Sequence, residues 1–387
     1  MSGRGPFVPL RHARFRALWL AGVVSFLGTW VHNVAARWTA ATLSESPLVV
    51  SAVDTLQLLP MVVLSVAAGV LADRNDRRTV LILTHAGLAI VTSAMALLAA
   101  LGHLTLPVLL GCTGLLGVLG ALNGPAWQAT VPRQVPDDEV PKAVALMSTG
   151  FNLARAVGPA AGAWMLVNVG PAAAFSTNAA SYLVIGALLW QLAPQPPSAV
   201  AVERPSPLSD PTLVRLFGLV FVFGLFAMPS LSLLAVVARD AIHGEAAQYG
   251  HLLSAFGIGA VSAGLAVASV ARRVGEKWMI AGTSLLASAG FALLAGADVE
   301  WEAVGGAAVC GAGWIGTIST INAAVQMRAP AEARARSLAF YLTFAVGGQA
   351  LGSLLGGWLA ATLGLAPALG VCGGALVLYA LLVLAVG

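Results

Sequence analysis

This sequence contains few charged residues. Only 9% of its 387 residues are Asp, Glu, Lys or Arg, and 58% are hydrophobic, whereas soluble domains average about 25% charged residues. This deficit excludes an ordinary soluble globular protein. Because a membrane-spanning helix needs about 20 mostly apolar residues, the length predicts an all-α polytopic membrane protein with about twelve transmembrane helices.

Lysine, cysteine and histidine are also scarce, and each scarcity excludes a class of site. The two lysines, Lys142 and Lys277, do not end a phosphate-binding G-x-x-x-x-G-K loop, which argues against ATP hydrolysis. The three cysteines lie in apolar runs without C-x-x-C spacing, and the six histidines show no metal-ligand spacing. We therefore expect no metal, no cofactor and no enzymatic activity.

Twelve hydrophobic runs, separated by charged and turn-forming residues, predict the transmembrane spans. They lie near residues 17–41, 47–71, 79–101, 105–127, 142–167, 173–193, 212–237, 247–270, 278–297, 303–326, 337–362 and 366–386. The longest polar break, 194–211, is rich in proline, which cannot continue a helix. The sequence therefore predicts an N-terminal six-helix bundle at 1–193, a cytoplasmic linker at 194–211 and a C-terminal six-helix bundle at 212–387.

The positions of the basic residues predict the orientation. When the N-terminus is placed inside, nearly all of the 20 Lys and Arg residues fall in cytoplasmic loops, as the positive-inside rule requires. We therefore expect both termini in the cytoplasm. The net charge of +4 is then a topology signal, and the lipid bilayer, rather than a nucleic acid, is the expected surrounding partner.

The two halves of the chain share a pattern of residues at a shift of about 195 positions, which is typical of a repeat. Matching pairs include Arg77 with Arg272, Arg78 with Arg273, Gly158 with Gly352 and Gly162 with Gly356. This pattern indicates a duplicated six-helix unit. Secondary transporters use such repeats and bind substrate between the halves near the membrane midplane.

The loop between the second and third spans reads GVLADRNDRR at residues 69–78. It resembles the signature loop of the major facilitator superfamily, G-x-L-A-D-R-x-G-R-[RK], except that Asp76 replaces the second glycine. The resemblance implies two pseudo-symmetric six-helix bundles and a cytoplasmic latch that closes the inner gate. The latch residues are Gly69, Asp73, Arg74, Arg77 and Arg78. The alternative is a charged loop that only satisfies the positive-inside rule.

The fifth span carries a second motif, made of Asn152, Gly158, Pro159 and Gly162. It is similar to the G-P-x-x-G core of exporters in this superfamily, and the wider run resembles a bacterial drug and siderophore efflux subgroup that includes enterobactin exporters. Ala154 stands where the longer exporter pattern has glycine. The resemblance implies export across a bacterial inner membrane, and the alternative is a generic kinked helix.

Ionisable residues within the spans are the candidates for proton coupling, because such residues are costly in a bilayer and usually line a pathway. His32 and Arg37 lie on the first span, and Asp54 lies on the second. Arg37 and Asp54 fall at similar depth on adjacent antiparallel helices. Asp54 is therefore either a proton carrier or one half of a permanent structural ion pair.

Other polar and aromatic residues in the spans are candidates for a substrate cavity. They are Thr29, Trp30, Asn33, Gln57, Asn123 and Arg155. Arg155 falls near mid-membrane and keeps its charge, so it needs an acceptor. It either anchors an anionic substrate group or ties the fifth span to its neighbours.

Together these features predict a monomeric, proton-coupled exporter of amphipathic small molecules such as antibiotics, siderophores or other natural products. Rocking of one six-helix bundle against the other would give alternating access. A nutrient importer and a non-transporting receptor or scramblase on the same scaffold are the alternatives.

Overall fold

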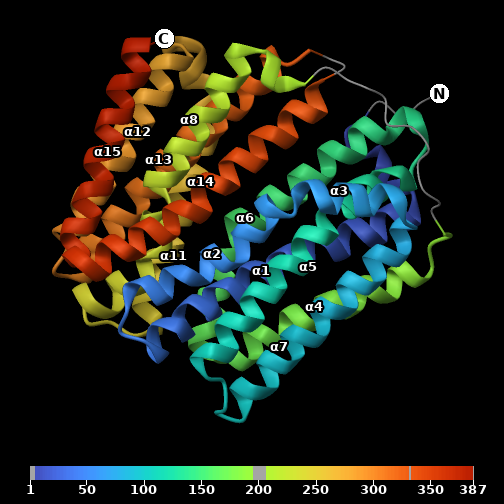
Figure 1. Cartoon of the computed structure of the whole chain (residues 1–387), viewed down its shortest axis with the longest axis horizontal. Coiled ribbons are helices and arrows are strands. Elements are labelled where there is room, and N and C mark those ends of the chain that lie inside the picture. The colour runs from blue at the N-terminus through green and yellow to red at the C-terminus, as the bar shows by residue number, and fades with distance from the viewer. Residues whose placement is uncertain (1–4, 195–205, 331–332, 387) are drawn as a thin grey trace. The chain divides into compact units, whose positions relative to one another are not determined.

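The computed structural model describes residues 5–194, 206–330 and 333–386, and within them the secondary structure is entirely helical (Figure 1). The long helices are α1 (Ala13–Leu43), α2 (Pro47–Val63), α4 (Arg77–Ala100), α5 (Leu106–Thr130), α6 (Val140–Asn168), α7 (Pro171–Trp190), α8 (Pro211–Ala227), α11 (Ala246–Val274), α12 (Glu276–Ala295), α13 (Glu300–Arg328), α14 (Arg334–Leu363) and α15 (Leu365–Val386). The short elements are η1 (Val8–Arg11), α3 (Ser65–Arg74), η2 (Val131–Gln134), η3 (Asp137–Glu139), η4 (Pro207–Ser209), α9 (Pro229–Ser232), α10 (Leu234–Val236) and the π-helix η5 (Val237–Ala241).

The helices agree with the predicted all-α membrane fold. In the described part of the chain, ten helical segments are long and apolar enough to cross a membrane, and the bent pair formed by α2 and α3 adds an eleventh. The 29-residue helix α6 occupies the predicted fifth span. The expected twelve-helix arrangement is thereby accounted for.

Two predicted spans are broken rather than continuous. The predicted span 47–71 divides at Leu64, between α2 and α3. The predicted span 212–237 divides at Met228 and Leu233, and it ends in the π-helix that extends to Ala241. Pro229 follows the first of these breaks, because proline donates no backbone hydrogen bond and its ring crowds the preceding turn.

Contacts between Cα atoms divide the chain into two compact units. Unit 1 contains Met1–Ala36 and Val63–Val200, and unit 2 contains Arg37–Val62 and Ala201–Gly387. The C-terminal part of α1 and nearly all of α2 therefore pack with helices from the second half of the sequence. The predicted bundle boundaries at 194–211 stay a prediction about the chain's topology.

Unit 1 is built on close contact between α1 and α6. A Cβ at Gly158 would lie 2.7 Å from Cγ of Trp30, and a Cβ at Gly162 would lie 2.9 Å from Cγ2 of Val34. Only glycine permits this approach, and small residues are what bring membrane helices together. Helix α4 contacts both α5 and α7 in the rest of the unit.

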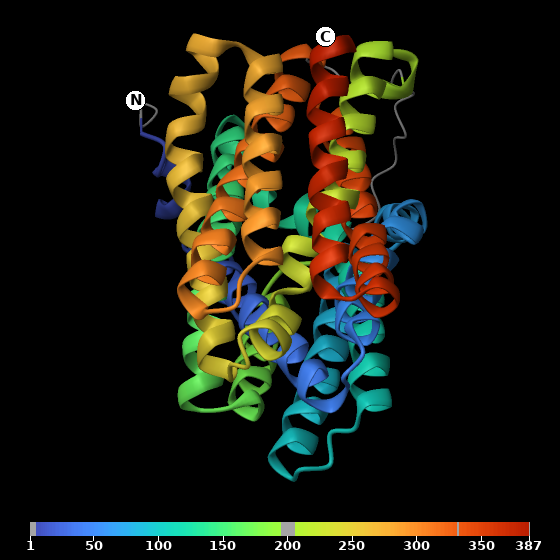
Figure 2. The ribbon, with the colours of Figure 1, turned by 90° about the vertical axis from the view of Figure 1, so that its left-hand side faces the viewer.

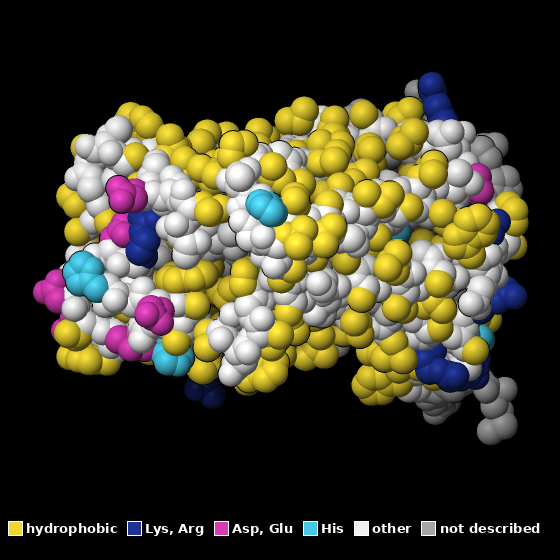
Figure 3. Space-filling view, turned by 90° about the horizontal axis from the view of Figure 1, so that it is seen from below, with side chains coloured by type: hydrophobic (Ala, Val, Ile, Leu, Met, Phe, Trp, Pro, Cys, Tyr) yellow, Lys and Arg dark blue, Asp and Glu magenta, His cyan; other side chains and the backbone are white. Residues whose placement is uncertain are grey.

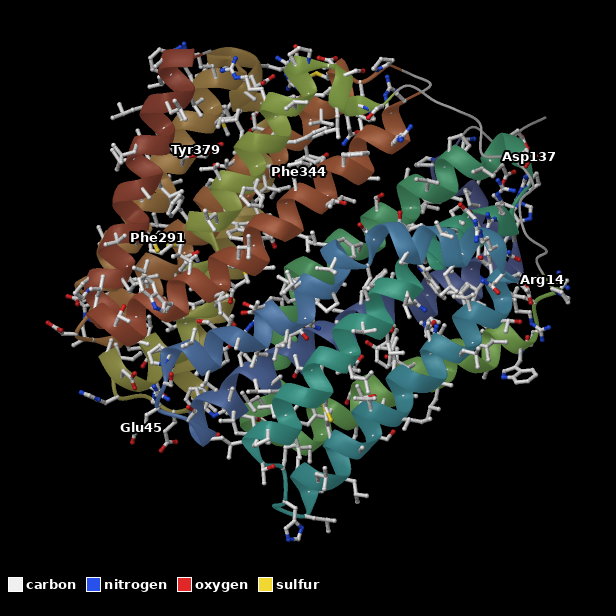
Figure 4. The ribbon with its side chains drawn as sticks, in the orientation of Figure 1. Arg14, Glu45, Asp137, Phe291, Phe344 and Tyr379 are labelled. Atoms are coloured by element: carbon white, nitrogen blue, oxygen red, sulfur yellow. The ribbon has the colours of Figure 1, made fainter. Side chains whose placement is uncertain are left out.

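Unit 2 repeats this arrangement with α14 and α8. A Cβ at Gly352 would lie 2.7 Å from the carbonyl oxygen of Gly224, and one at Gly356 would lie 2.6 Å from Cβ of Pro229. The matched glycines of the two halves thus pack the fifth helix of each half on the first. Phe344, labelled in Figure 4, extends the α8–α14 contact by stacking on Phe217 at 5.6 Å between ring centroids.

The remaining helices of unit 2 form a side-by-side layer in which α12 contacts α13 and α15, and α13 also contacts α11 (Figure 2). Many large apolar side chains on the long helices point outward and are exposed, as expected for helices in lipid. Figure 3 shows that hydrophobic side chains dominate the face in view and that charged side chains are few.

The glycine contact in unit 1 makes a stability prediction. Gly158→Val should destabilise the protein by at least about 1–3 kcal/mol, the usual cost of overpacking, because the added methyl groups overlap Trp30. Thermal unfolding of the purified protein in detergent measures the effect. Gly186→Val is the matched control, since among the described residues no atom lies within 4 Å of a Cβ at that position. Equal unfolding temperatures for the two variants would contradict the packing argument.

Candidate functional site

A buried ion pair joins α1 to α2 inside unit 2. Nε of Arg37 donates to Oδ1 and Oδ2 of Asp54 at 2.8 and 3.0 Å, and Nη2 of Arg37 donates to Oδ1 at 2.6 Å. The side chains are only 4% and 3% exposed. The structure thus brings together the two charged residues that the sequence placed at similar depth.

Two aromatic residues enclose this ion pair. The hydroxyl of Tyr249, on α11, lies beside the guanidinium of Arg37. Trp38 stacks on Tyr249 with 5.5 Å between ring centroids. Among the described residues, Nη1 of Arg37 has no hydrogen-bond partner of good geometry. The buried guanidinium therefore has both a carboxylate and a phenolic hydroxyl close to it.

Helix α14 packs against the same part of α2. The hydroxyl of Ser353 donates to the carbonyl oxygen of Ser51 at 2.7 Å, and the hydroxyl of Thr55 donates to the carbonyl oxygen of Ala350 at 3.0 Å. Gly357 leaves the room for this contact, because a Cβ there would lie 2.6 Å from Cβ of Ser51. The ion pair thus lies where helices from distant parts of the sequence are tightly joined.

Electrostatics hold the two buried side chains of this pair together. Removing both charges from water costs several kcal/mol per ion, and the pair is stable only while each charge keeps its partner. Arg37 keeps its charge under all ordinary conditions.

The segment predicted as a loop at 69–78 forms a second site, in unit 1; residues 69–74 lie in α3, and α4 begins at Arg77. Asp73 is 68% exposed on its side chain and accepts a hydrogen bond from Nη2 of Arg77 at 3.2 Å. Arg77 is buried and also donates through Nε to the carbonyl oxygen of Ala72. Arg74 is exposed, and among the described residues no atom lies within 4 Å of a Cβ at Gly69. Asp73 is thus held in place and presented to solvent.

The remaining residues of this loop cap helix ends. Asp76, the one departure from the superfamily pattern, is the N-cap of α4 and accepts from the backbone N–H of Arg78 and the hydroxyl of Thr79. Arg78 donates to the carbonyl oxygens of Leu189 and Trp190 at 3.2 and 2.7 Å, at the C-terminus of α7. The loop is therefore fixed to unit 1 at two points.

The predicted exporter motif lies on α6. Gly158 and Gly162 contact α1 as described above, and Pro159 is buried within the helix without ending it. The side chains of Asn152 and Arg155 lie outside the described residues, so the proposed acceptor for Arg155 stays a prediction.

A polar network in unit 1 contains further candidate cavity residues. Asn123 donates to the hydroxyl of Thr84 at 2.8 Å and lies 3.0 Å from Nδ1 of His85. The hydroxyls of Thr29 and Tyr182 are 3.2 Å apart. Asparagine and histidine side chains of this kind usually join helices by hydrogen bonds within a bilayer.

Three other candidates are placed less specifically. His32 is buried, and its ring packs on Phe175 at 4.8 Å. Asn33 and Gln57 are both partly buried. Sequence analysis missed His85, Tyr182 and Tyr249, because a single polar residue in an apolar run shows no partner until the helices are folded. Within the described residues, no three His, Cys, Asp or Glu side chains cluster closely enough to hold a metal ion.

One known protein family matches almost the whole sequence. A family profile described as transmembrane secretion effector matches residues 4–387. The staphyloferrin A transporter of Staphylococcus aureus is 27% identical over 160 residues, which are 41% of this chain and 40% of the relative. Macrolide efflux protein A of Streptococcus pyogenes is 27% identical over 152 residues, which are 39% and 37% of the two chains. The matched region thus spans about two fifths of each of these curated relatives.

Solved transporter structures have a similar fold over nearly the whole chain. A variant of the nucleoside transporter NupG has a TM-score of 0.75 at 13% identity, with 96% of this chain and 99% of that chain covered. A bacterial homologue of the human lysosomal transporter Spinster, crystallised in an inward-facing and occupied conformation, has a TM-score of 0.74 at 15% identity, with 99% and 97% covered. At these identities the likeness shows the fold. Because the family profile covers almost every residue, the chain belongs to the transmembrane secretion effector family of major facilitator superfamily transporters, which are not enzymes.

Proposed function

We propose that this membrane transporter is a proton-coupled exporter of amphipathic small molecules that works by alternating access. The observation that carries the proposal is the buried pair of Arg37 and Asp54, held against Tyr249 at a junction of helices from both halves of the sequence. In this proposal the protein works as a monomer in a bacterial inner membrane, with both termini in the cytoplasm.

The proposed coupling follows from the energetics of the pair. While Asp54 is ionised, separating it from Arg37 leaves an unpaired charge in an apolar environment, which is costly. A proton neutralises Asp54, so Asp54 no longer carries an unpaired charge when the two side chains separate. The free energy of Arg37 then falls when its guanidinium moves toward water or an anionic group. Proton binding drives the conformational cycle only because the paired and separated states bind the proton differently.

The substrate class and the direction rest on other features. Two relatives are named as a staphyloferrin A transporter and a macrolide efflux protein, which supports a small-molecule natural product as the substrate. Export is favoured by the α6 motif, in which Gly158 and Gly162 set the approach of α6 to α1. We assign Thr29, Trp30, Asn33, Gln57, Asn123 and Arg155 as the residues to test for substrate contact.

The proposed proton site makes a transport prediction. Asp54→Asn should abolish substrate uptake driven by a proton gradient in everted vesicles, because the amide cannot exchange a proton. The variant should still fold, since the amide oxygen can accept from Arg37. Asp210→Asn is the matched control: Asp210 caps α8 through its side-chain oxygen, and asparagine caps equally well. Full gradient-driven uptake by Asp54→Asn would reject the proton role.

The proposed inner latch makes a kinetic prediction. Asp73→Asn should slow turnover by about tenfold, the size of a conformational coupling of about 1.4 kcal/mol, while substrate affinity changes little. Asp76→Asn is the control within the same loop, because asparagine preserves the N-cap of α4. Turnover is measured in proteoliposomes and affinity by equilibrium binding. An unchanged turnover for Asp73→Asn would count against the latch.

A further inference from the structure

One buried tyrosine lies beside the ion pair without a hydrogen bond of good geometry to it. Tyr249 is on α11, and its side chain is fully buried. Its hydroxyl lies beside the guanidinium of Arg37. Among the described residues, this hydroxyl has no hydrogen-bond partner. Because a buried hydroxyl without a partner is costly, its position requires a physical reason.

The guanidinium of Arg37 has one nitrogen that Asp54 does not use. Nε donates to both carboxylate oxygens of Asp54, and Nη2 donates to Oδ1. Nη1 is buried and, within the described part of the chain, has no hydrogen-bond partner. A phenolic oxygen has lone pairs that can accept from a guanidinium N–H. Nη1 of Arg37 and the hydroxyl of Tyr249 are thus an unpaired donor and an unpaired acceptor on neighbouring side chains.

Aromatic packing restricts the direction of the hydroxyl. The ring of Tyr249 stacks on Trp38, with 5.5 Å between the ring centroids and 16° between the ring planes. Trp38 follows Arg37 directly on α1. The hydroxyl is fixed to the far end of a rigid ring, so a ring held flat against Trp38 cannot turn its hydroxyl far from the guanidinium.

Other charged side chains near the start of α11 have partners of their own. They are Arg239 with Asp240, His251 with Glu300, and Glu245, which caps α11. Arg239 also donates to three backbone carbonyl oxygens at the end of α1 and in the turn that follows. Helix α14 meets α2 through hydroxyl and carbonyl groups, which do not titrate. In the described residues, the charged and titratable groups that face Asp54 are therefore Arg37 and Tyr249.

We propose that Tyr249 is a positioning residue of the proton site, which accepts a hydrogen bond from Nη1 of Arg37 when Asp54 takes up a proton. The proton goes to Oδ2 of Asp54, which accepts only the longest of the three bonds, at 3.0 Å. Oδ1 continues to accept from Nη2, and a small shift of the guanidinium brings Nη1 onto the phenolic oxygen. This role rests on the proton coupling proposed above.

Arg37 then keeps hydrogen-bond partners in both protonation states of Asp54. A buried arginine does not lose its charge, so protonation of Asp54 leaves a cation that neighbouring dipoles must stabilise. The hydroxyl of Tyr249 supplies such a dipole within unit 2. The proton can therefore bind without separation of the helices, and its uptake is less costly than in a site where Arg37 has no second acceptor.

Infrared titration of the Asp54 carboxyl group in liposomes tests this role. The signal is the protonated carboxyl band that is absent from Asp54→Asn, followed as the pH is lowered. Tyr249→Phe keeps the ring that stacks on Trp38 but removes the acceptor. The midpoint of the band should therefore fall by about one pH unit, the size of one hydrogen bond to a charged group.

Tyr379→Phe is the matched control. Tyr379, labelled in Figure 4, is also buried in unit 2, and among the described residues its hydroxyl has no partner either. It packs on Phe223 rather than beside the ion pair. The midpoint of the Asp54 band should be the same in Tyr379→Phe as in the wild type.

The outcomes separate the role of Tyr249 from the proposed function. An unchanged midpoint in Tyr249→Phe would overturn the role even where a proton gradient drives transport. A lower midpoint in a protein whose transport ignores the gradient would support the role and reject the coupling. An equal fall in Tyr379→Phe would show a general effect of removing a buried hydroxyl and would overturn the role. A wild-type protein without an Asp54 band would overturn both.

A double-mutant cycle provides an independent test. Asp54→Asn resembles the protonated state, because its side chain is neutral and keeps one acceptor oxygen for Arg37. Tyr249→Phe should lower the thermal unfolding temperature about twice as much in the Asp54→Asn background as in the wild type, since Arg37 then depends on the hydroxyl. Tyr379→Phe should cause the same loss in both backgrounds. Equal losses for Tyr249→Phe in the two backgrounds would overturn the proposal.

Discussion

An arginine inside a membrane protein must keep a partner for its charge, and the packing around α2 follows from this constraint. Arg37 is fully charged and 4% exposed on its side chain, and Asp54 neutralises it through three hydrogen bonds. Tyr249 lies beside the guanidinium of Arg37, and Trp38 stacks on Tyr249. The segment 37–62, which contains both members of the pair, packs with the second half of the chain through the hydrogen bonds from Thr55 to Ala350 and from Ser353 to Ser51.

Both units contain the same kind of close helix contact, made at glycine residues. In each unit, a fifth helix approaches a first helix through glycines spaced four residues apart: Gly158 and Gly162 in unit 1, and Gly352 and Gly356 in unit 2. Such contacts depend on the absence of side chains rather than on polar bonds, so the helices can pack closely with few specific interactions.

Much of the fold was predictable from the sequence because membrane helices leave strong signals. Long apolar runs, glycine spacing and the distribution of arginines gave the all-α architecture, and Arg37 and Asp54 were expected to lie at similar depth. The breaks in the second and seventh spans were not predicted, because hydrophobicity is continuous across Leu64 and Leu233. In the sequence, Asp76 was visible only as a departure from a motif. Its role as an N-cap could not be predicted without knowing that α4 begins at the next residue.

The contact that Arg239 makes was the least predictable from the sequence. Its acceptors are backbone carbonyl oxygens, which every residue has, so no sequence pattern marks them. Tyr249 and His85 were missed for a related reason: their partners lie on other helices. The sequence therefore reveals charges and small residues in the spans, but it does not reveal which helix ends those charges stabilise.

The central claim is that Asp54 exchanges its arginine partner for a proton during transport. Infrared difference spectroscopy of the protein in liposomes, recorded as the external pH is lowered, tests this directly. The account predicts a band from a newly protonated carboxyl group in the wild-type protein that is missing in Asp54→Asn. A wild-type spectrum without such a band, in protein that transports under the same conditions, would contradict the claim.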